Sequence, residues 1–258
     1  MATSASEIPI PQPAVPTAFF RNITFVMGLL VLAGFSMQWL AGRSTFTARP
    51  LVHVHALIFM GWIAIFVSQA SLATSGRIDV HRRLGKLAML WVPLMVAAAI
   101  AIAVDVTRRG TAPFFFLPQY FVVANPMTVL FFAGFFIAAV RMRKRTDWHM
   151  RLQICATTCI MGPAFGRLLP MPLIIPYSYQ SAEIMCLLFP IAGAIRDWRR
   201  DRVVHPAWWY GIAAIPMLLL FSNLIAYSSA GNAIYAWVTA GSPGASVPGL
   251  AFPAAPPL

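Results

Sequence analysis

Long apolar runs separated by short polar segments make up most of this chain. A helix that crosses a bilayer needs about 20 mostly apolar residues, because the hydrocarbon core is ~30 Å thick. A helix also satisfies its own backbone hydrogen bonds within lipid. The pattern therefore predicts an all-α bundle of about seven transmembrane helices, with expected bounds at Phe20–Leu40, Leu51–Leu72, Leu84–Val104, Phe114–Val140, Met150–Leu168, Leu173–Ile195 and Ala207–Tyr227.

Prolines interrupt the fifth and sixth of these runs, at Pro163, Pro170, Pro172 and Pro176. A proline inside a membrane helix removes one backbone hydrogen bond and usually kinks the helix. These two spans are therefore expected to be less regular than the others.

The segments outside the apolar runs form two flanks. Residues 1–19 are rich in Pro and Ser, and no basic residue precedes the first run, so the pattern predicts a disordered cytoplasmic arm rather than a signal peptide. Residues 20–228 form the membrane domain. Residues 229–258 are uncharged and rich in Ala, Gly and Pro, which predicts a flexible outer tail with a short helix around Asn232–Thr239.

The basic residues are distributed unequally between the two ends of the predicted helices. With seven spans, 14 of the 19 Lys and Arg residues fall on the side that carries the N-terminus. Cytoplasmic loops of membrane proteins carry this excess, so the N-terminus is expected inside and the C-terminus outside.

Composition agrees with a membrane protein and excludes other classes. The chain of 258 residues is 59% hydrophobic and only 10% charged. The net charge of +12 does not indicate nucleic-acid binding, because the basic residues lie in short loops between apolar runs. All three cysteines lie inside apolar runs, so no disulfide framework is expected. The apolar composition makes the lipid bilayer the expected surrounding of the protein.

An Asp-x-His-x-Arg motif occurs twice, at Asp79–Arg83 and at Asp147–Arg151. Each copy immediately precedes an apolar run, and aspartate is a favoured N-cap, so each copy is expected to open a membrane helix. The two helices run parallel in the predicted topology. His81 and His149 are therefore expected at the same depth, where they can face each other.

Two histidines from separate helices are the ligands that a six-coordinate haem b requires. A helix N-terminus disfavours the histidine cation, which keeps His81 and His149 neutral and able to bind a metal. The neighbouring arginines Arg82, Arg83 and Arg151 are candidate partners of the haem propionates. A metal ion held by the two histidines and two aspartates is an alternative, and so is a purely structural role in which Asp caps, Arg contacts lipid phosphate and His lies at the interface.

A second polar group is expected toward the outer face. Glu183 is the only acidic residue deep within an apolar run, and such a residue is a candidate functional site. Its expected partner is Arg167, which ends the fifth run. His55 is the histidine expected to face the bundle, and Tyr177 and Gln180 lie near Glu183 in sequence. This group is either a ligand or proton site or a structural ion pair.

The chain resembles a bacterial family of predicted multi-pass membrane proteins of unknown function. The likeness rests on His55, His81-Arg82-Arg83-Leu84-Gly85, Trp148-His149-Met150-Arg151 and Gly166-Arg167. It implies a multi-pass protein of the bacterial inner membrane.

A more distant resemblance is to the ascorbate-dependent transmembrane cytochromes b. In those proteins histidine pairs from core helices two and four, and from three and five, hold two haems. In this chain the third and fifth spans carry His81 and His149, whereas the fourth span has no histidine. The resemblance therefore implies one haem b at most, in an electron-transfer or oxidoreductase subunit with a redox partner. The competing expectation is a non-enzymatic transporter or a lipid- or anion-binding protein that holds a small-molecule ligand at His55, Arg167 and Glu183.

Overall fold

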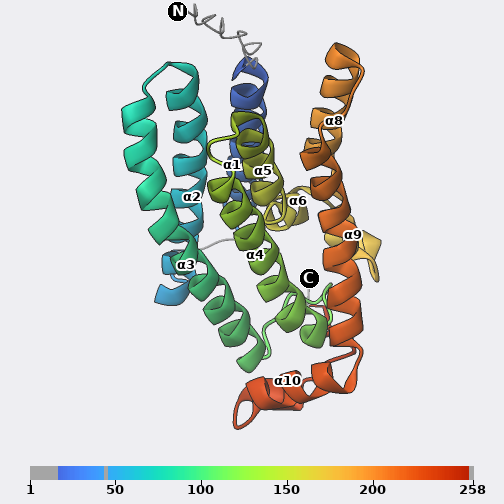
Figure 1. The fold of residues 1–258 in the computed structure, drawn as a ribbon. Helices are drawn as coiled ribbons and strands as arrows, with labels where there is room; N and C mark the ends of the chain where they lie inside the picture. Colours follow the sequence, from blue (N-terminus) through green and yellow to red (C-terminus); the bar gives the residue numbers. More distant parts are fainter. Residues whose placement is uncertain (1–16, 44–45, 256–258) are drawn as a thin grey trace, which may run out of the picture.

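The structure is a computed structural model that describes residues 17–43 and 46–255. Its regular elements are α-helices and short 3-10 turns, which confirms the all-α class (Figure 1). Within the described residues, six helical segments are long and apolar enough to cross a membrane. They are α1 (Thr17–Leu40), α2 (Pro50–Thr74), α3 (Ile78–Arg108), α4 (Pro118–Arg141), the nearly continuous pair α7 (Ser178–Cys186) and α8 (Leu188–Asp201), and α9 (Pro206–Ala226). The chain is a multi-pass membrane protein.

These segments correspond to six of the seven predicted spans, and the fifth run has a different form. It folds as α5 (Thr146–Thr158) and α6 (Gly162–Leu168), separated by a turn at residues 159–161. Pro163 lies in the first turn of α6, where its missing N–H is tolerated, but it cannot continue the hydrogen bonds of α5. The sixth run likewise begins with a 3-10 turn, η1 (Met171–Ile174), before α7 starts.

Proline and glycine mark several other helix ends. Pro50, Pro118 and Pro206 occupy first turns, where the fixed φ of proline suits the start of a helix. Gly76 follows the last turn of α2 with φ +73°, a left-handed conformation that glycine adopts without a Cβ penalty. These residues set where the spans stop and turn back.

The helices pack as a bundle in which the broken fifth segment lies among the others. In Figure 1, α2 and α3 form one side and α8 and α9 the other. α5 packs against α4 and α9, and α6 packs against α1. Gly34 of α1 allows the last of these contacts, because a Cβ at this position would lie 2.8 Å from the carbonyl oxygen of Ala164.

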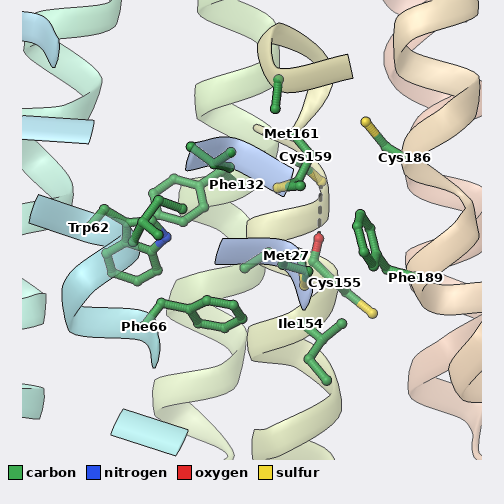
Figure 2. Close-up of a cluster of buried hydrophobic side chains, with 14 of the residues drawn as sticks. Met27, Trp62, Phe66, Phe132, Ile154, Cys155, Cys159, Met161, Cys186 and Phe189 are labelled. Atoms are coloured by element: carbon green, nitrogen blue, oxygen red, sulfur yellow. Dashed lines mark hydrogen bonds between the residues drawn. The ribbon is translucent and has the colours of Figure 1, made fainter. Parts of the chain in front are cut away.

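The core is rich in aromatic and sulfur-containing side chains. Trp62 of α2 packs edge-on against Phe132 and Phe136 of α4, with ring centres 4.8 and 5.6 Å apart. Figure 2 shows these residues' neighbours, including Met27 and the three cysteines. Such side chains fill irregular space between helices of unequal length. This core fixes α2, α4 and α5, the helices around the predicted histidine pair.

The C-terminal segment, predicted to be a flexible tail, is folded as far as residue 255. It forms α10 (Ser229–Thr239), which contains the predicted helix, and the 3-10 turn η2 (Pro243–Ser246). The Tyr235 hydroxyl donates to the Val247 carbonyl at 2.9 Å, and the guanidinium of Arg108 donates to the Val238 carbonyl at 2.8 Å. Tertiary hydrogen bonds of this kind order an Ala- and Gly-rich segment that has little helix-forming pattern of its own. Of the predicted N-terminal arm, residues 1–16 lie outside the described residues.

Candidate functional site

The two Asp-x-His-x-Arg histidines lie next to each other in the structure. His81 is in the first turn of α3 and His149 is in the first turn of α5. Their ring centres are 6.4 Å apart and their planes are nearly perpendicular, at 83°. The repeated motif therefore brings two imidazoles from separate helices to one place, as the sequence predicted.

Hydrogen bonds to neighbouring helices fix the orientation and tautomer of both rings. Nδ1 of His81 lies 3.2 Å from the backbone carbonyl oxygen of Gln69 in α2. Nδ1 of His149 lies 2.8 Å from that of Ala139 in α4. A carbonyl only accepts, so each Nδ1 carries the proton and each Nε2 keeps a lone pair. Histidines that bind metals commonly donate their other ring N–H in this way.

The donor set suits a cofactor that brings its own ligands better than a bare metal ion. Among the described residues, no group of three or more His, Cys, Asp or Glu side chains is arranged to hold a metal ion. Asp147, one of the two aspartates considered as metal ligands, accepts a hydrogen bond from His205 at 3.0 Å. Two imidazoles without carboxylate partners would suit a haem, which brings its remaining ligands with it.

The three arginines predicted to contact haem propionates have different surroundings. Arg82 and Arg83 are exposed beside His81. Arg151 is buried and forms two hydrogen bonds of 3.0 Å to the carboxylate of Asp197 in α8. The guanidinium of Arg151 is thus directed toward the α8–α9 side of the bundle, and only Arg82 and Arg83 remain as candidates for the propionates.

Asp197 is the centre of a buried charge network that the sequence analysis did not identify. Its carboxylate is 1% exposed and also accepts from Arg196 at 2.9 Å and from the Trp208 indole at 2.8 Å. Arg151 stacks near Phe20 as well, with 5.2 Å from its guanidinium carbon to the ring centre. In sequence Asp197 lies in the run Arg196-Asp197-Trp198-Arg199, which is typical of an exposed helix end. Its burial at the α5–α8–α9 contact has no local sequence signal.

His205 links the same region to the start of α9. It is the N-cap of α9, where its Nδ1 accepts the Ala207 N–H at 3.2 Å. Its Nε2 therefore carries the proton and donates to Asp147. Burial lowers the pKa of His205, and the hydrogen bond to Asp147 acts in the opposite direction. The two hydrogen bonds fix the tautomer and orientation of the His205 ring, which is a structural role that the sequence did not predict.

The predicted outer group is only partly assembled. His55 of α2 stacks on Phe59 with ring centres 4.4 Å apart, and it lies within reach of the charge of Arg167. Arg167 donates to the Pro163 carbonyl at 2.8 Å and lies over the Phe35 ring at 4.0 Å. The ion pairs of the described residues do not include the expected pair of Arg167 and Glu183. The α5–α6 turn places Arg167 toward α1, away from α7.

Glu183 is instead buried without a positively charged partner. It is 2% exposed, and its Oε2 has no hydrogen-bond partner in the described structure. Tyr177 is 67% exposed and does not join it. Gln180 has a buried and unpartnered Oε1, and it is one residue away from Tyr179, which lies close to Glu183. The predicted group thus separates into His55 with Arg167 and an isolated Glu183.

Comparison of the chain with protein-family models, with characterised proteins and with solved structures gives no significant match.

Proposed function

We propose that this protein is a haem-b-binding electron-transfer or oxidoreductase subunit, with His81 and His149 as the two axial ligands. The observation that carries the proposal is the arrangement of the two imidazoles, with their Nδ1 atoms bonded to backbone carbonyls and their Nε2 lone pairs free. The resemblance to transmembrane cytochromes b points to the same residues.

The spacing of the rings supports a shared metal. A metal lies ~2 Å from the imidazole nitrogen it binds, and that nitrogen lies about 1 Å from its ring centre, so two rings on opposite sides of a metal have centres ~6 Å apart. The observed separation of the ring centres is 6.4 Å.

A bound haem would supply one-electron redox chemistry, and the protein would supply its ligation and electrostatic environment. The carbonyls of Gln69 and Ala139 orient the ligands and raise their basicity. The exposed guanidinium groups of Arg82 and Arg83 provide positive charge for the propionates. The same arginines give this end of the bundle a basic surface, which favours a redox partner with an acidic one.

The expected membrane arrangement belongs to the same proposal. The N-terminus lies in the cytoplasm, α5 and α6 together form a seventh and broken span, and the protein resides in the inner membrane of a bacterium. The excess of basic residues around α2–α3, α4–α5 and α8–α9 supports this orientation. In this arrangement the histidine pair lies near the cytoplasmic surface.

The test is the absorption spectrum of the full chain, produced with excess haem precursor and purified in detergent. We expect a Soret band with about one haem per chain, and loss of the low-spin bis-imidazole signal in both His81→Ala and His149→Ala. His53→Ala is the matched control, because His53 contacts the Phe46 carbonyl at the opposite end of the bundle and should not affect the spectrum. A colourless parent protein under these conditions, or an unchanged spectrum in both histidine variants, would refute the proposal.

The competing class, a non-enzymatic transporter or a lipid- or anion-binding protein with a site at His55, Arg167 and Glu183, has less support. An anion site requires converging positive charge, whereas Arg167 is directed to Phe35 and to the Pro163 carbonyl. Glu183 is a negative group and has a separate environment.

A further inference from the structure

Besides Oε1 of Gln180, four buried oxygen atoms without a hydrogen-bond partner among the described residues lie on α4, α7 and α9. They are the hydroxyls of Tyr120, Tyr179 and Ser222 and Oε2 of Glu183, all unpartnered within the described residues. Their residues are 3%, 8%, 0% and 2% exposed, respectively. Buried polar groups are almost always hydrogen-bonded, so four exceptions on neighbouring helices require an explanation such as a bound water or ion.

These atoms belong to one cluster. The rings of Tyr120 and Tyr179 pack edge-to-face with centres 5.1 Å apart. Glu183 lies near both tyrosines. Ser222 faces the Tyr120 hydroxyl, although the two form no hydrogen bond of ordinary geometry. Three helices therefore contribute oxygen atoms to the cluster that contains Glu183.

The surroundings of Glu183 are negative or neutral. The titratable groups that face it are Tyr120 from α4, Cys159 from the α5–α6 turn, and Tyr179 and Cys186 from α7. No Lys, Arg or His is among them. The α5 helix ends beside Cys159, and the carbonyl end of a helix carries partial negative charge. The N-terminus of the short helix α6, at Gly162, offers the carboxylate only a partial positive charge, and no charged side chain compensates it.

Close backbone packing holds the carboxylate in this position. Gly162 opens α6, and a Cβ there would overlap Oε1 of Glu183 and lie 3.3 Å from Oε2. The absence of a side chain at residue 162 is thus what makes room for the carboxyl group between α6 and α7. The position of Glu183 follows from the break between α5 and α6.

We propose that Glu183, with the hydroxyls of Tyr120, Tyr179 and Ser222, binds a single positive charge, either a sodium ion or a proton. One carboxylate and three neutral hydroxyls balance one charge, and oxygen-only ligands suit a hard cation. Discontinuous membrane helices are a recurring setting for such ion sites. Tyr227, 53% exposed just after α9, lies 6.1 Å ring to ring from Tyr120, so the cluster lies near this exposed end of the bundle. The site is independent of the proposed haem ligands.

The test measures the melting temperature of the full chain in detergent at constant ionic strength, with NaCl replacing choline chloride. A ligand that binds only the folded state stabilises it by mass action, so saturating Na⁺ is expected to raise the melting temperature by about 3–10 °C. Glu183→Gln removes the charge at nearly the same volume and should abolish the response. Tyr179→Phe keeps the carboxylate and provides a second measurement, and it should raise the half-saturating Na⁺ concentration roughly tenfold or more.

Two glycine variants test the geometry. Gly162→Ala displaces the carboxylate and should weaken the Na⁺ response, whereas Gly134→Ala should leave it unchanged, because a Cβ at residue 134 meets nothing within 4 Å. Equal responses in these two variants would contradict the assignment of Glu183 as the ligand.

The proton alternative gives a different result in the same assay. In that case Na⁺ has no effect, and the melting temperature of the parent falls relative to that of Glu183→Gln as the pH rises from about 6 to about 9 and the proton is lost. A parent protein that responds to neither Na⁺ nor pH through Glu183 would overturn the proposal. The haem spectrum of Glu183→Gln should match that of the parent, so the two proposals can fail separately.

Discussion

Replacement of Asp197 by Asn is expected to destabilise the protein more than any change at an exposed ion pair. Asp197 accepts two hydrogen bonds from Arg151, one from Arg196 and one from Trp208, and it is 1% exposed. Asparagine has nearly the same volume but no charge, and its amide nitrogen cannot accept. The substitution leaves Arg151, 7% exposed, without a counter-charge.

The expected magnitude follows from the burial of the pair. Removal of one partner of a buried ion pair typically lowers the free energy of unfolding by ~3–5 kcal/mol, because the remaining charge is stranded in a poorly solvated site. For a chain of this size, 1 kcal/mol corresponds to about 2–4 °C in melting temperature. The expected decrease for Asp197→Asn is therefore about 6–20 °C.

The protein supplies a matched control a few residues away. Arg200 and Asp201 form an ion pair of 3.4 Å at the end of α8, and their side chains are 40% and 51% exposed. Exposed pairs typically contribute ~0–1 kcal/mol, so Asp201→Asn should change the melting temperature by at most a few degrees. Both variants are measured by fluorescence-detected thermal unfolding in the same detergent.

A double-mutant cycle completes the test. If Asp197 and Arg151 interact as observed, the double variant Arg151→Met with Asp197→Asn should lose less than the sum of the two single losses. Similar small shifts for Asp197→Asn and Asp201→Asn would refute the reasoning, and so would additive losses in the cycle.

Three further outcomes follow from other contacts. Burial lowers the pKa of His205, so the unfolded chain takes up a proton near pH 6.5 while the folded protein does not, and stability is lost as the pH falls through this value. His205→Asn keeps an N-cap acceptor but does not titrate in this range. It should therefore lose less stability than the parent between about pH 7.5 and about pH 5.5. The unfolding losses of Arg167→Gln and Glu183→Gln should be additive, because the two side chains have separate partners, and a double variant that recovers stability would show that they pair. Gln119 donates to the Ala226 carbonyl and to the Asn232 side chain at 2.6 and 2.7 Å, so Gln119→Ala should increase proteolysis of α10, and an unchanged digestion pattern would contradict this anchoring role.

The apolar runs were sufficient to predict the all-α class and six of the spans, because in lipid the length of a run directly determines whether it crosses. The irregular fifth segment was predictable in part from Pro163. The repeated Asp-x-His-x-Arg motif also predicted correctly that His81 and His149 lie close together. Two parallel helices that start at the same membrane face place their first turns at the same depth.

The pairing of charges was not predictable in the same way. Arg167 was expected to meet Glu183 because both flank the proline-rich turn, but the direction in which a short helix such as α6 leaves a turn depends on packing, here against Gly34 of α1. Asp197 was passed over because its neighbours are basic and aromatic, as at many interfacial helix ends. Its role depends on α9 returning Trp208 against it, a contact between segments that local sequence does not encode.

The unpartnered hydroxyls were missed for a related reason. Tyr120 and Ser222 lie 102 positions apart on two mainly apolar spans, and each side chain carries a single hydroxyl group. Only the packed bundle shows that both are buried beside Glu183.

The burial of Cys155, Cys159 and Cys186 has a practical consequence for studies of orientation in the membrane. These are the only cysteines in the chain, and each is 0% exposed within the core shown in Figure 2. The native protein thus presents no thiol to a water-soluble maleimide, so a single cysteine introduced at Ser75 or at Ser246 reports its own side of the bilayer without prior removal of the native ones. Ser75 lies in the exposed turn between α2 and α3, and Ser246 lies in η2 beyond α10, so labelling of intact cells distinguishes the two ends of the bundle directly.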